Sequence, residues 1–409
     1  MKERAWHKFP VLFSLYIAQS IPMSFFSTVV PVIMRQQNYS LESIGLLQLI
    51  KLPWILKFLW APLIDRRATS TGKLKQWIIG SELFYAVIIL SISFLNLETD
   101  FNLIVVFMVI AFVASATQDI ATDAYAIFML KPAERSLGNS MQSGGSFVGT
   151  LFGTGVLLVA YYYFGWSSLL MLLAAFVVFA IAPLLLYRRK ANIDPGIKSD
   201  VNLRDIAGFF KMKGIGRRVL ILVFYYSGIV GILAMLKPYM VDLGYTVKEI
   251  GIYSGVIGTS VAVTASLIAG FIIRKIGRRR SAIAFVLTGL VAASYFLFLS
   301  LHTPSTVEIL LGIGLLWGTY GLSTVVIYTT SMDIVRPGRE GTDFTVQIVI
   351  THLSSLIIVV LSGRIGDLTG YTGLFSIEVL LCIIATVIVY FTFSKKMLDE
   401  NSGKITAKI

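Results

Sequence analysis

Cysteine and histidine are scarce in this sequence. Cys382 is the one cysteine among 409 residues, and there are three histidines. A single cysteine excludes an internal disulfide and any metal or redox site built from several cysteines. The chain also lacks a Gly-x-Ser-x-Gly nucleophile turn and any cluster of histidines that could hold a metal or serve as a base. We therefore expect no catalytic residues, no metal and no cofactor.

Charge is scarce as well. Charged residues make up 14% of the chain and hydrophobic residues 56%, and the mean hydropathy is +0.80. This composition excludes an ordinary soluble protein of two or three domains. Twelve apolar runs each reach the length of about 20 residues that a helix needs to cross a bilayer. They cover residues 9–34, 43–64, 76–97, 101–130, 137–162, 166–187, 218–241, 249–273, 281–301, 307–333, 343–362 and 371–394. The sequence predicts an all-α membrane protein with twelve transmembrane helices.

The basic residues lie on one side of the predicted membrane. The net charge is +13, and 29 of the 35 Lys and Arg residues fall in alternate connections or at the termini. Basic residues concentrate in cytoplasmic loops, so this bias places both termini in the cytoplasm. The charge thus encodes orientation and does not indicate nucleic-acid binding. We expect a multi-pass protein of the cell inner (cytoplasmic) membrane, in contact with lipid and monomeric.

The two halves of the chain resemble each other. Residues 38–46 have a counterpart in 244–252, and Lys131 to Arg135 recurs as Arg336 to Glu340, at nearly the same separation and on the same side of the membrane. Six spans per half give parallel halves, the arrangement of major facilitator transporters. We therefore predict two parallel six-helix bundles at residues 1–188 and 218–409, joined by a cytoplasmic linker at 189–217.

Four charged residues fall inside predicted spans of the first half. Lys51 and Lys57 lie in the second span, and Asp119 and Asp123 share one face of the fourth. Such residues are costly in a bilayer and are functional candidates. Depth along straight helices predicts that Lys57 meets Asp123 and Lys51 meets Asp119. The group is interpreted either as a permanent ion-pair network or as a proton-coupling site, with Asp119 favoured as the proton carrier.

Polar and aromatic residues on other spans predict a substrate cavity. The candidates are Gln19, Gln118, Tyr226, Lys237, Trp317, Tyr320 and His352. Aromatic faces and hydrogen-bonding groups would suit a sugar-like or ring-bearing ligand. Two of these have a simpler alternative: Lys237 can extend to the interface, and His352 can be a packing residue. Glu82 and Glu378 are given no role, because they lie on helices expected at the periphery.

Two segments carry a resemblance to a known family. Residues 57–66, Lys-Phe-Leu-Trp-Ala-Pro-Leu-Ile-Asp-Arg, and 116–124, Ala-Thr-Gln-Asp-Ile-Ala-Thr-Asp-Ala, resemble AmpG-type muropeptide permeases. The second segment is similar to acetyl-CoA transporters too. The resemblance implies that Asp65 and Arg66 belong to a cytoplasmic gating motif, with Arg278 and Arg279 as its basic remnant in the second half.

The resemblance also implies a function. AmpG-type permeases take up anhydro-muropeptides, which are amino-sugar peptides of the cell wall, together with protons. Siderophore importers of the RhtX/FptX type and acetyl-CoA transporters share the same landmarks and remain alternatives. A channel is less compatible with duplicated halves and buried carboxylates than alternating access is. The charged residues of the second and fourth spans have no counterparts in the second half, so we expect coupling in the first half.

Overall fold

The computed structural model describes residues 7–36, 47–68, 70–97, 99–187 and 201–393. Within these ranges the regular structure is entirely helical, and no strand occurs. The α-helices are α1 (Lys8–Ser24), α2 (Val30–Gln36), α4 (Leu52–Leu56), α5 (Ala61–Arg67), α6 (Thr71–Ile92), α7 (Phe101–Met129), α8 (Arg135–Leu151), α9 (Leu157–Phe179), α10 (Ala182–Leu186), α11 (Arg204–Phe210), α12 (Ile215–Phe224), α13 (Ser227–Asp242), α14 (Val247–Ile250), α15 (Thr259–Ile276), α16 (Arg278–Leu299), α17 (Thr306–Asp333) and α18 (Glu340–Thr392).

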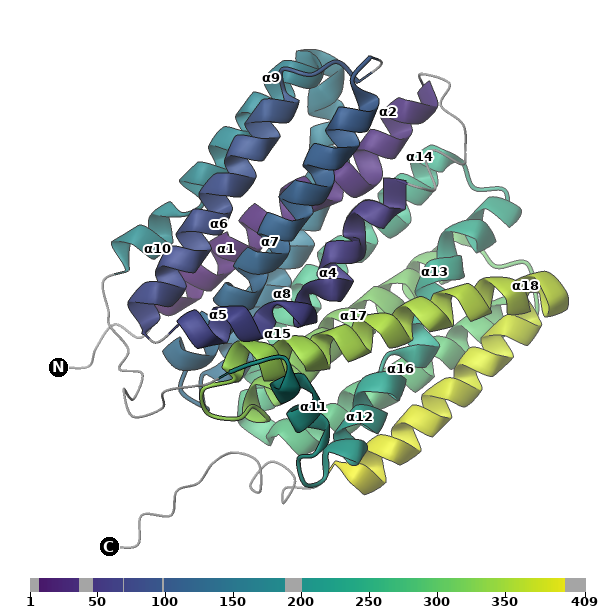
Figure 1. Ribbon diagram of the computed structural model, residues 1–409. Coiled ribbons are helices and arrows are strands. Elements are labelled where there is room, and N and C mark those ends of the chain that lie inside the picture. The colour runs from purple at the N-terminus through teal and green to yellow at the C-terminus, as the bar shows by residue number, and fades with distance from the viewer. Residues whose placement is uncertain (1–6, 37–46, 69, 98, 188–200, 394–409) are drawn as a thin grey trace, which may run out of the picture. The chain divides into compact units, whose positions relative to one another are not determined.

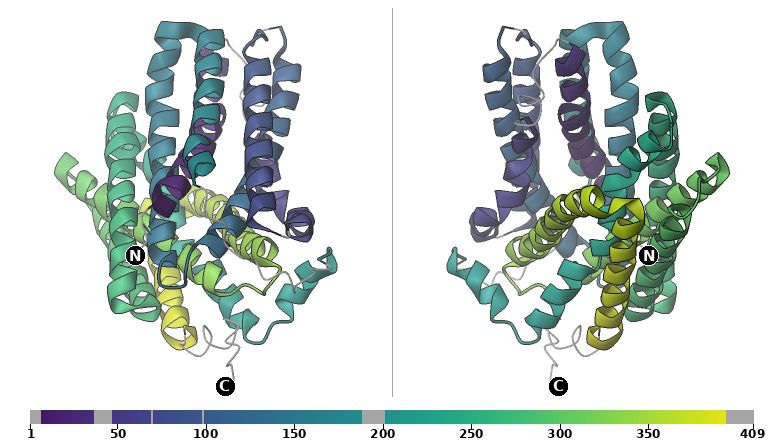
Figure 2. Two further views of the ribbon diagram at one scale, coloured as in Figure 1. Left: turned by 90° about the vertical axis from the view of Figure 1, so that its left-hand side faces the viewer. Right: turned by 90° about the vertical axis from the view of Figure 1, so that its right-hand side faces the viewer.

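Membrane-spanning helices dominate the structure. Nine helices of the described residues are long and apolar enough to cross a bilayer, so the prediction of a helical membrane protein is confirmed. The count of twelve stays a prediction. The difference arises in part because α18 extends through both of the last two predicted spans, as its two arms in Figure 1 and Figure 2 show.

The second predicted span is broken into short pieces. A 3₁₀ turn, Gln48–Lys51, leads into α4, and a second, Lys57–Leu59, precedes α5. Pro53 and Pro62 each lie in the first turn of the helix that follows a break. Proline is tolerated there because it has no N–H to contribute, whereas in a helix interior it removes a hydrogen bond. The two prolines are the sequence signal for this interruption.

Two glycines turn the chain at equivalent places in the halves. Gly165 inside α9 has φ 70° and ψ −178°, and Gly370 inside α18 has φ 68° and ψ −179°. A positive φ is readily available only to glycine, so both positions require it. Their separation matches the separation of the sequence repeats. The same backbone device therefore joins the fifth predicted span to the sixth and the eleventh to the twelfth.

The chain forms two compact units. Unit 1 contains residues 1–131, 145–205 and 338–345, and unit 2 contains residues 132–144, 206–337 and 346–409. In unit 1, α6 packs along α7 and α9, and in unit 2, α15 and α16 pack along α17. Of the predicted linker, residues 189–200 lie outside the described residues, as does the repeated segment at 38–46, and residues 204–210 form α11. The predicted boundaries at 188 and 218 stay a prediction.

Small residues bring α8 close to α1 within unit 1. A Cβ atom at Gly145 would lie 2.7 Å from the Phe13 carbonyl oxygen, and one at Gly149 would lie 2.6 Å from the Ser20 Cβ. Side-chain atoms essentially never come that close, so the glycines allow the two helices to approach. This contact fixes α1, which carries part of the site described next.

Candidate functional site

A buried polar cluster joins three segments of unit 1. The Lys57 ammonium forms an ion pair with Asp119 of α7, and Gln19 Nε2 of α1 donates a hydrogen bond of 2.9 Å to the same carboxylate. One helical turn further along α7, Asp123 accepts a hydrogen bond from the Tyr16 hydroxyl. Lys57 is 1% exposed and Asp119 3% exposed. The cluster therefore holds charged groups that water does not reach in this conformation.

The pairing inside the cluster differs from the predicted one. Lys57 forms its ion pair with Asp119, the carboxylate that we expected Lys51 to approach, and not with the predicted partner Asp123. The depth estimate assumed a straight helix and compared backbone heights alone. The 3₁₀ turn at Lys57–Leu59 adds only about 1.5 Å to the height of Lys57, so the long lysine side chain supplies the rest of the reach to Asp119. Asp119 and Asp123 do share a face of α7, as their spacing predicts. Lys51, which is half-buried, lies at the end of the first 3₁₀ turn.

Several polar atoms next to this cluster have no protein partner. Both amide atoms of Gln118 and the Thr122 hydroxyl are buried and find no hydrogen bond among the described residues. Gln118 and Thr122 are four residues apart on α7, so they share a face of the helix. Buried polar groups are almost always paired in native structures. These two side chains therefore keep unused hydrogen-bonding capacity among the described residues.

Asp65 binds the first turn of α18. Its carboxylate accepts hydrogen bonds from the backbone N–H groups of Gly341 at 3.0 Å and Thr342 at 2.6 Å, and from the Thr342 hydroxyl at 2.6 Å. A carboxylate at a helix N-terminus satisfies N–H groups that have no partner in the helix. Burial raises the pKa of Asp65 to about 7, although the hydrogen bonds from Thr342 oppose the shift. Arg66, the next residue of the predicted gating motif, is exposed.

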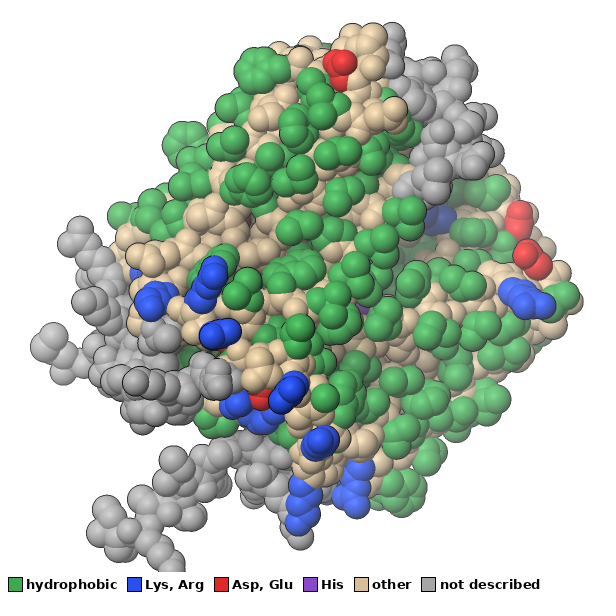
Figure 3. Space-filling view, viewed as in Figure 1, with side chains coloured by type: hydrophobic (Ala, Val, Ile, Leu, Met, Phe, Trp, Pro, Cys, Tyr) green, Lys and Arg blue, Asp and Glu red, His purple; other side chains and the backbone are tan. Residues whose placement is uncertain are grey.

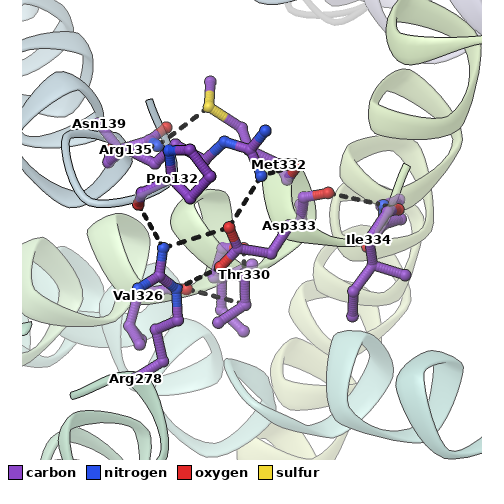
Figure 4. A network of polar contacts seen from close by, with 12 residues as sticks. Pro132, Arg135, Asn139, Arg278, Val326, Thr330, Met332, Asp333 and Ile334 are labelled. Carbon is purple, nitrogen blue, oxygen red and sulfur yellow. Dashed lines mark hydrogen bonds and ion pairs between the residues drawn. The ribbon is translucent and has the colours of Figure 1, made fainter. Parts of the chain in front are cut away.

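A second charged cluster lies in unit 2 (Figure 4). Arg278 forms an ion pair with Asp333 at the end of α17 and donates a hydrogen bond of 2.6 Å to the Pro132 carbonyl. Arg135 donates hydrogen bonds of 2.9 Å to the other Asp333 oxygen and to the Met332 carbonyl. Asp333 thus links α17 to α8 and α16. Sequence reasoning proposed Arg278 but missed Asp333 and Arg135, while the predicted Arg279 is exposed.

Arg218 of α12 is a buried cation that sequence reasoning also missed. It is 1% exposed and donates to Gln347 Oε1 at 2.9 Å, Thr330 Oγ1 at 3.0 Å, Ser331 Oγ at 2.6 Å and the Ile327 carbonyl at 3.2 Å. These are neutral acceptors, so hydrogen bonds compensate the desolvation of the guanidinium. In the sequence, Arg218 stands at the boundary between the predicted linker and the seventh predicted span. Its distance along the chain from other polar residues does not indicate its partners.

Three predicted cavity residues form an aromatic cluster in unit 2. The ring centroids of Tyr226 and Tyr320 are 5.8 Å apart, and those of Trp317 and Tyr320 are 6.1 Å apart, all edge to face. The Trp317 indole N–H is buried and donates to none of the described residues. The cluster could give an aromatic surface and one donor to a ligand. Lys237 is exposed on α13, and His352 is half-buried on α18.

Comparison with known proteins identifies the family. The sequence profile of the Major Facilitator Superfamily matches residues 12–346 and, in a second match, 263–406. The chain belongs to the Major Facilitator Superfamily. It is thus a membrane transporter, and the expectation that it is no enzyme is confirmed by this membership. Solved structures of this superfamily agree in fold. The human organic anion transporter MFSD10 superposes with a TM-score of 0.76 at 13% identity, over 95% of this chain and 100% of that one.

Relatives of this chain include proteins named for the predicted AmpG group. The anhydromuropeptide permease of Escherichia coli (strain K12) is 25% identical over 293 residues, which cover 70% of this chain and 60% of the permease. A Rickettsia conorii protein named as transporter AmpG 4 is 22% identical over 403 residues, covering 94% of this chain and 96% of that protein. The resemblance to AmpG-type permeases is therefore confirmed.

Proposed function

We propose that this superfamily member is a proton-coupled secondary active transporter that takes up anhydro-muropeptides by alternating access. The observation that carries the proposal is the buried ion pair of Lys57 and Asp119, with Gln19 as a third partner. A carboxylate inside a membrane bundle is costly and is a candidate proton carrier. Protonation of Asp119 would remove the charge that compensates Lys57, so a proton would change the interactions between the second and fourth predicted spans.

The substrate assignment is supported by the relatives and by the aromatic cluster. One relative is named an anhydromuropeptide permease and another AmpG. Unit 2 holds the rings of Tyr226, Trp317 and Tyr320, and unit 1 holds the unpaired amide of Gln118; aromatic rings and amides are groups of the kinds that bind sugars and amides. An amino-sugar peptide presents both kinds of surface.

The proposal includes the topology of the chain in the membrane. We place twelve helices as two parallel bundles in the cell inner membrane, with both termini cytoplasmic and the protein monomeric. The equivalent turns at Gly165 and Gly370 support the duplication. The one-sided distribution of Lys and Arg supports the orientation. We assign Asp65 and Arg66 to a cytoplasmic gating motif of the first half, and Arg278 and Arg279 to its counterpart in the second half.

Uptake by purified protein in proteoliposomes tests the function. We expect a labelled anhydro-disaccharide peptide to accumulate when the outside is acidic, and accumulation to stop when a protonophore is added. Asp119→Asn should abolish the response to the proton gradient, and Asp367→Asn, an exposed acid on α18, should preserve it. Accumulation of a ferric siderophore or acetyl-CoA in place of the peptide would overturn the substrate. Gradient-driven uptake by Asp119→Asn would overturn the coupling site.

A further inference from the structure

A hollow on unit 1 shares only Arg66 with the sites described so far. It has a volume of about 820 Å³ and is lined by residues of α5, α6 and α7. This volume falls within the range of about 300–1,000 Å³ typical of ligand pockets. We propose that the hollow binds an anionic phospholipid, with its phosphate at the basic end and an acyl chain along α6 and α7.

One end of the hollow is basic. Arg66 and Arg67 come from the end of α5, and Lys73 comes from the first turn of α6. All three side chains are exposed, and neither Asp nor Glu occurs among the described residues that line the hollow. Figure 3 shows Lys and Arg side chains where α5 ends and α6 begins, and hydrophobic side chains beyond them. Basic pockets between helices on the cytoplasmic side suit anionic lipid headgroups.

The rest of the hollow is an apolar strip of matching length. On α6 it follows Trp77, Gly80 and Phe84, which are three or four residues apart and share a face. From Lys73 to Phe84 the helix rises about 16 Å. Half of a hydrocarbon core is about 15 Å thick. A lipid with its phosphate at Lys73 therefore has its chain along α6 as far as the middle of the bilayer.

Gly80 leaves the floor of the hollow open. A Cβ atom at Gly80 would meet nothing within 4 Å, whereas one at Gly149 would touch α1. A helical glycine costs about 1 kcal/mol relative to alanine, and packing between helices does not account for this one. The space above Gly80 is thus lined by protein but unfilled by it. An acyl chain is the ligand that fits an open apolar strip at this depth in a membrane.

The experiment compares two lipids of identical chains, palmitoyl-oleoyl phosphatidylglycerol and palmitoyl-oleoyl phosphatidylcholine, by native mass spectrometry of the purified protein. We expect phosphatidylglycerol to stay bound and phosphatidylcholine to dissociate. Arg67→Gln with Lys73→Gln should weaken phosphatidylglycerol binding roughly thirtyfold, because each basic residue near a headgroup contributes about fivefold. Arg274→Gln with Lys275→Gln, which removes two exposed charges from the end of α15, is the matched control and should bind like the parent.

A second variant tests the apolar part independently of charge. Gly80→Leu places a side chain in the strip at a position where its Cβ meets nothing within 4 Å, so it should fold like the parent and lose the bound lipid. Gly155→Leu, where a Cβ also meets nothing within 4 Å, places the same side chain outside the hollow and should retain the lipid. Unchanged lipid binding by Gly80→Leu, or equal retention of both lipids by the parent, would overturn the proposal. Retention of glycerol phosphate as tightly as of phosphatidylglycerol would also overturn it, because the ligand would then be a phosphate alone.

Discussion

Lys57 carries a positive charge that has almost no access to water, and Asp119 is its carboxylate partner. Removing one member of a buried ion pair leaves the other charge desolvated, which costs about 3–5 kcal/mol. We therefore expect Lys57→Met and Asp119→Leu each to lower the free energy of unfolding by that amount. The double variant should recover most of the loss, because neither charge remains.

A double-mutant cycle measured by unfolding in detergent checks this expectation. Lys275→Met, at an exposed lysine of α15, is the control and should change stability by less than about 0.5 kcal/mol. If the losses of the two single variants simply add in the double variant, the two side chains do not interact as described.

Arg218 gives a second prediction at the scale of one residue. Its planar guanidinium donates to four acceptors on α17 and α18 at once. A lysine keeps the charge but has a single nitrogen, so it cannot reach all four. We expect Arg218→Lys to lower the free energy of unfolding by about 1–3 kcal/mol, since buried acceptors lose their donors. Arg217→Lys, at an exposed neighbour, should leave the free energy of unfolding unchanged. An equal loss of stability in both variants would show that the hydrogen bonds of Arg218 do not account for its effect.

The residues that spacing could predict are those whose partners lie on the same helix. Asp119 and Asp123 were expected on one face of α7 because they are four residues apart, and the structure places them so. Arg135, Arg218 and Asp333 were missed, because each binds partners far away in the sequence. Glu82 and Glu378 were given no role because their helices were expected at the periphery, and each side chain is 1% exposed. The expected place of a helix does not tell which way a side chain on it points.

At the scale of the element, the close packing of α8 against α1 depends on glycines of α8 that have no side chain. A methyl group at Gly149 would lie 2.6 Å from Ser20 Cβ, so the helices would have to separate. Overpacking of this kind costs about 1–3 kcal/mol, and we expect Gly149→Ala to lower the unfolding temperature measurably. Gly155→Ala adds the same methyl group where nothing lies within 4 Å and should leave that temperature unchanged or raise it. Equal behaviour of the two variants would contradict the close packing.

The first turn of α18 gives a prediction about pH. The pKa of Asp65 in its buried contact is about 7, above the ordinary value of 3.8. A carboxyl whose pKa is raised binds its proton more tightly in the contact than after release. The contact is therefore strongest below about pH 4 and weakens as the pH rises to about 7, by about 1.4 kcal/mol per pH unit.

Hydrogen exchange of the Gly341 and Thr342 amides measures the contact directly. Asp65→Asn cannot ionise, so the ratio of its exchange rate to that of the parent removes the intrinsic effect of pH. We expect the parent to lose protection relative to the variant between pH 4 and pH 7. A gain in protection over that range would mean that the hydrogen bonds to the ionised carboxylate outweigh its burial.

Composition predicted which segments form long membrane-spanning helices. It did not predict where a helix is interrupted. The long apolar runs predicted α6, α7, α16 and α17 within a few residues. The second predicted span was taken as one helix, although Pro53 and Pro62 mark its breaks. That error amounts to about 1.5 Å in the height of Lys57, which is less than the rise of about 6 Å between Asp123 and Asp119. The remaining difference lies in the direction of the long lysine side chain, which the average hydropathy of the segment does not determine.

At the scale of the whole molecule, the duplication predicts which loops share a side of the membrane. Gly72 follows the second predicted span and Lys275 follows the eighth, so six crossings should separate them. Thr99 and Thr303 lie in the corresponding connections after the third and ninth spans. All four residues are exposed, and Cys382 is buried. Single cysteines can therefore be placed at these positions in a Cys382→Ala background and labelled with a membrane-impermeant maleimide.

The labelling pattern depends on whether the number of crossings between two positions is even or odd, and on which side the basic loops face. We expect Gly72→Cys and Lys275→Cys to react in inside-out vesicles, because basic loops face the cytoplasm. Thr99→Cys and Thr303→Cys should react in right-side-out vesicles. Reaction of Gly72→Cys and Lys275→Cys on opposite sides would require an odd number of crossings between them, which is incompatible with two parallel six-helix halves. Reaction of both on the outside would preserve the duplication and reverse the orientation, so one experiment separates the two parts of the topology.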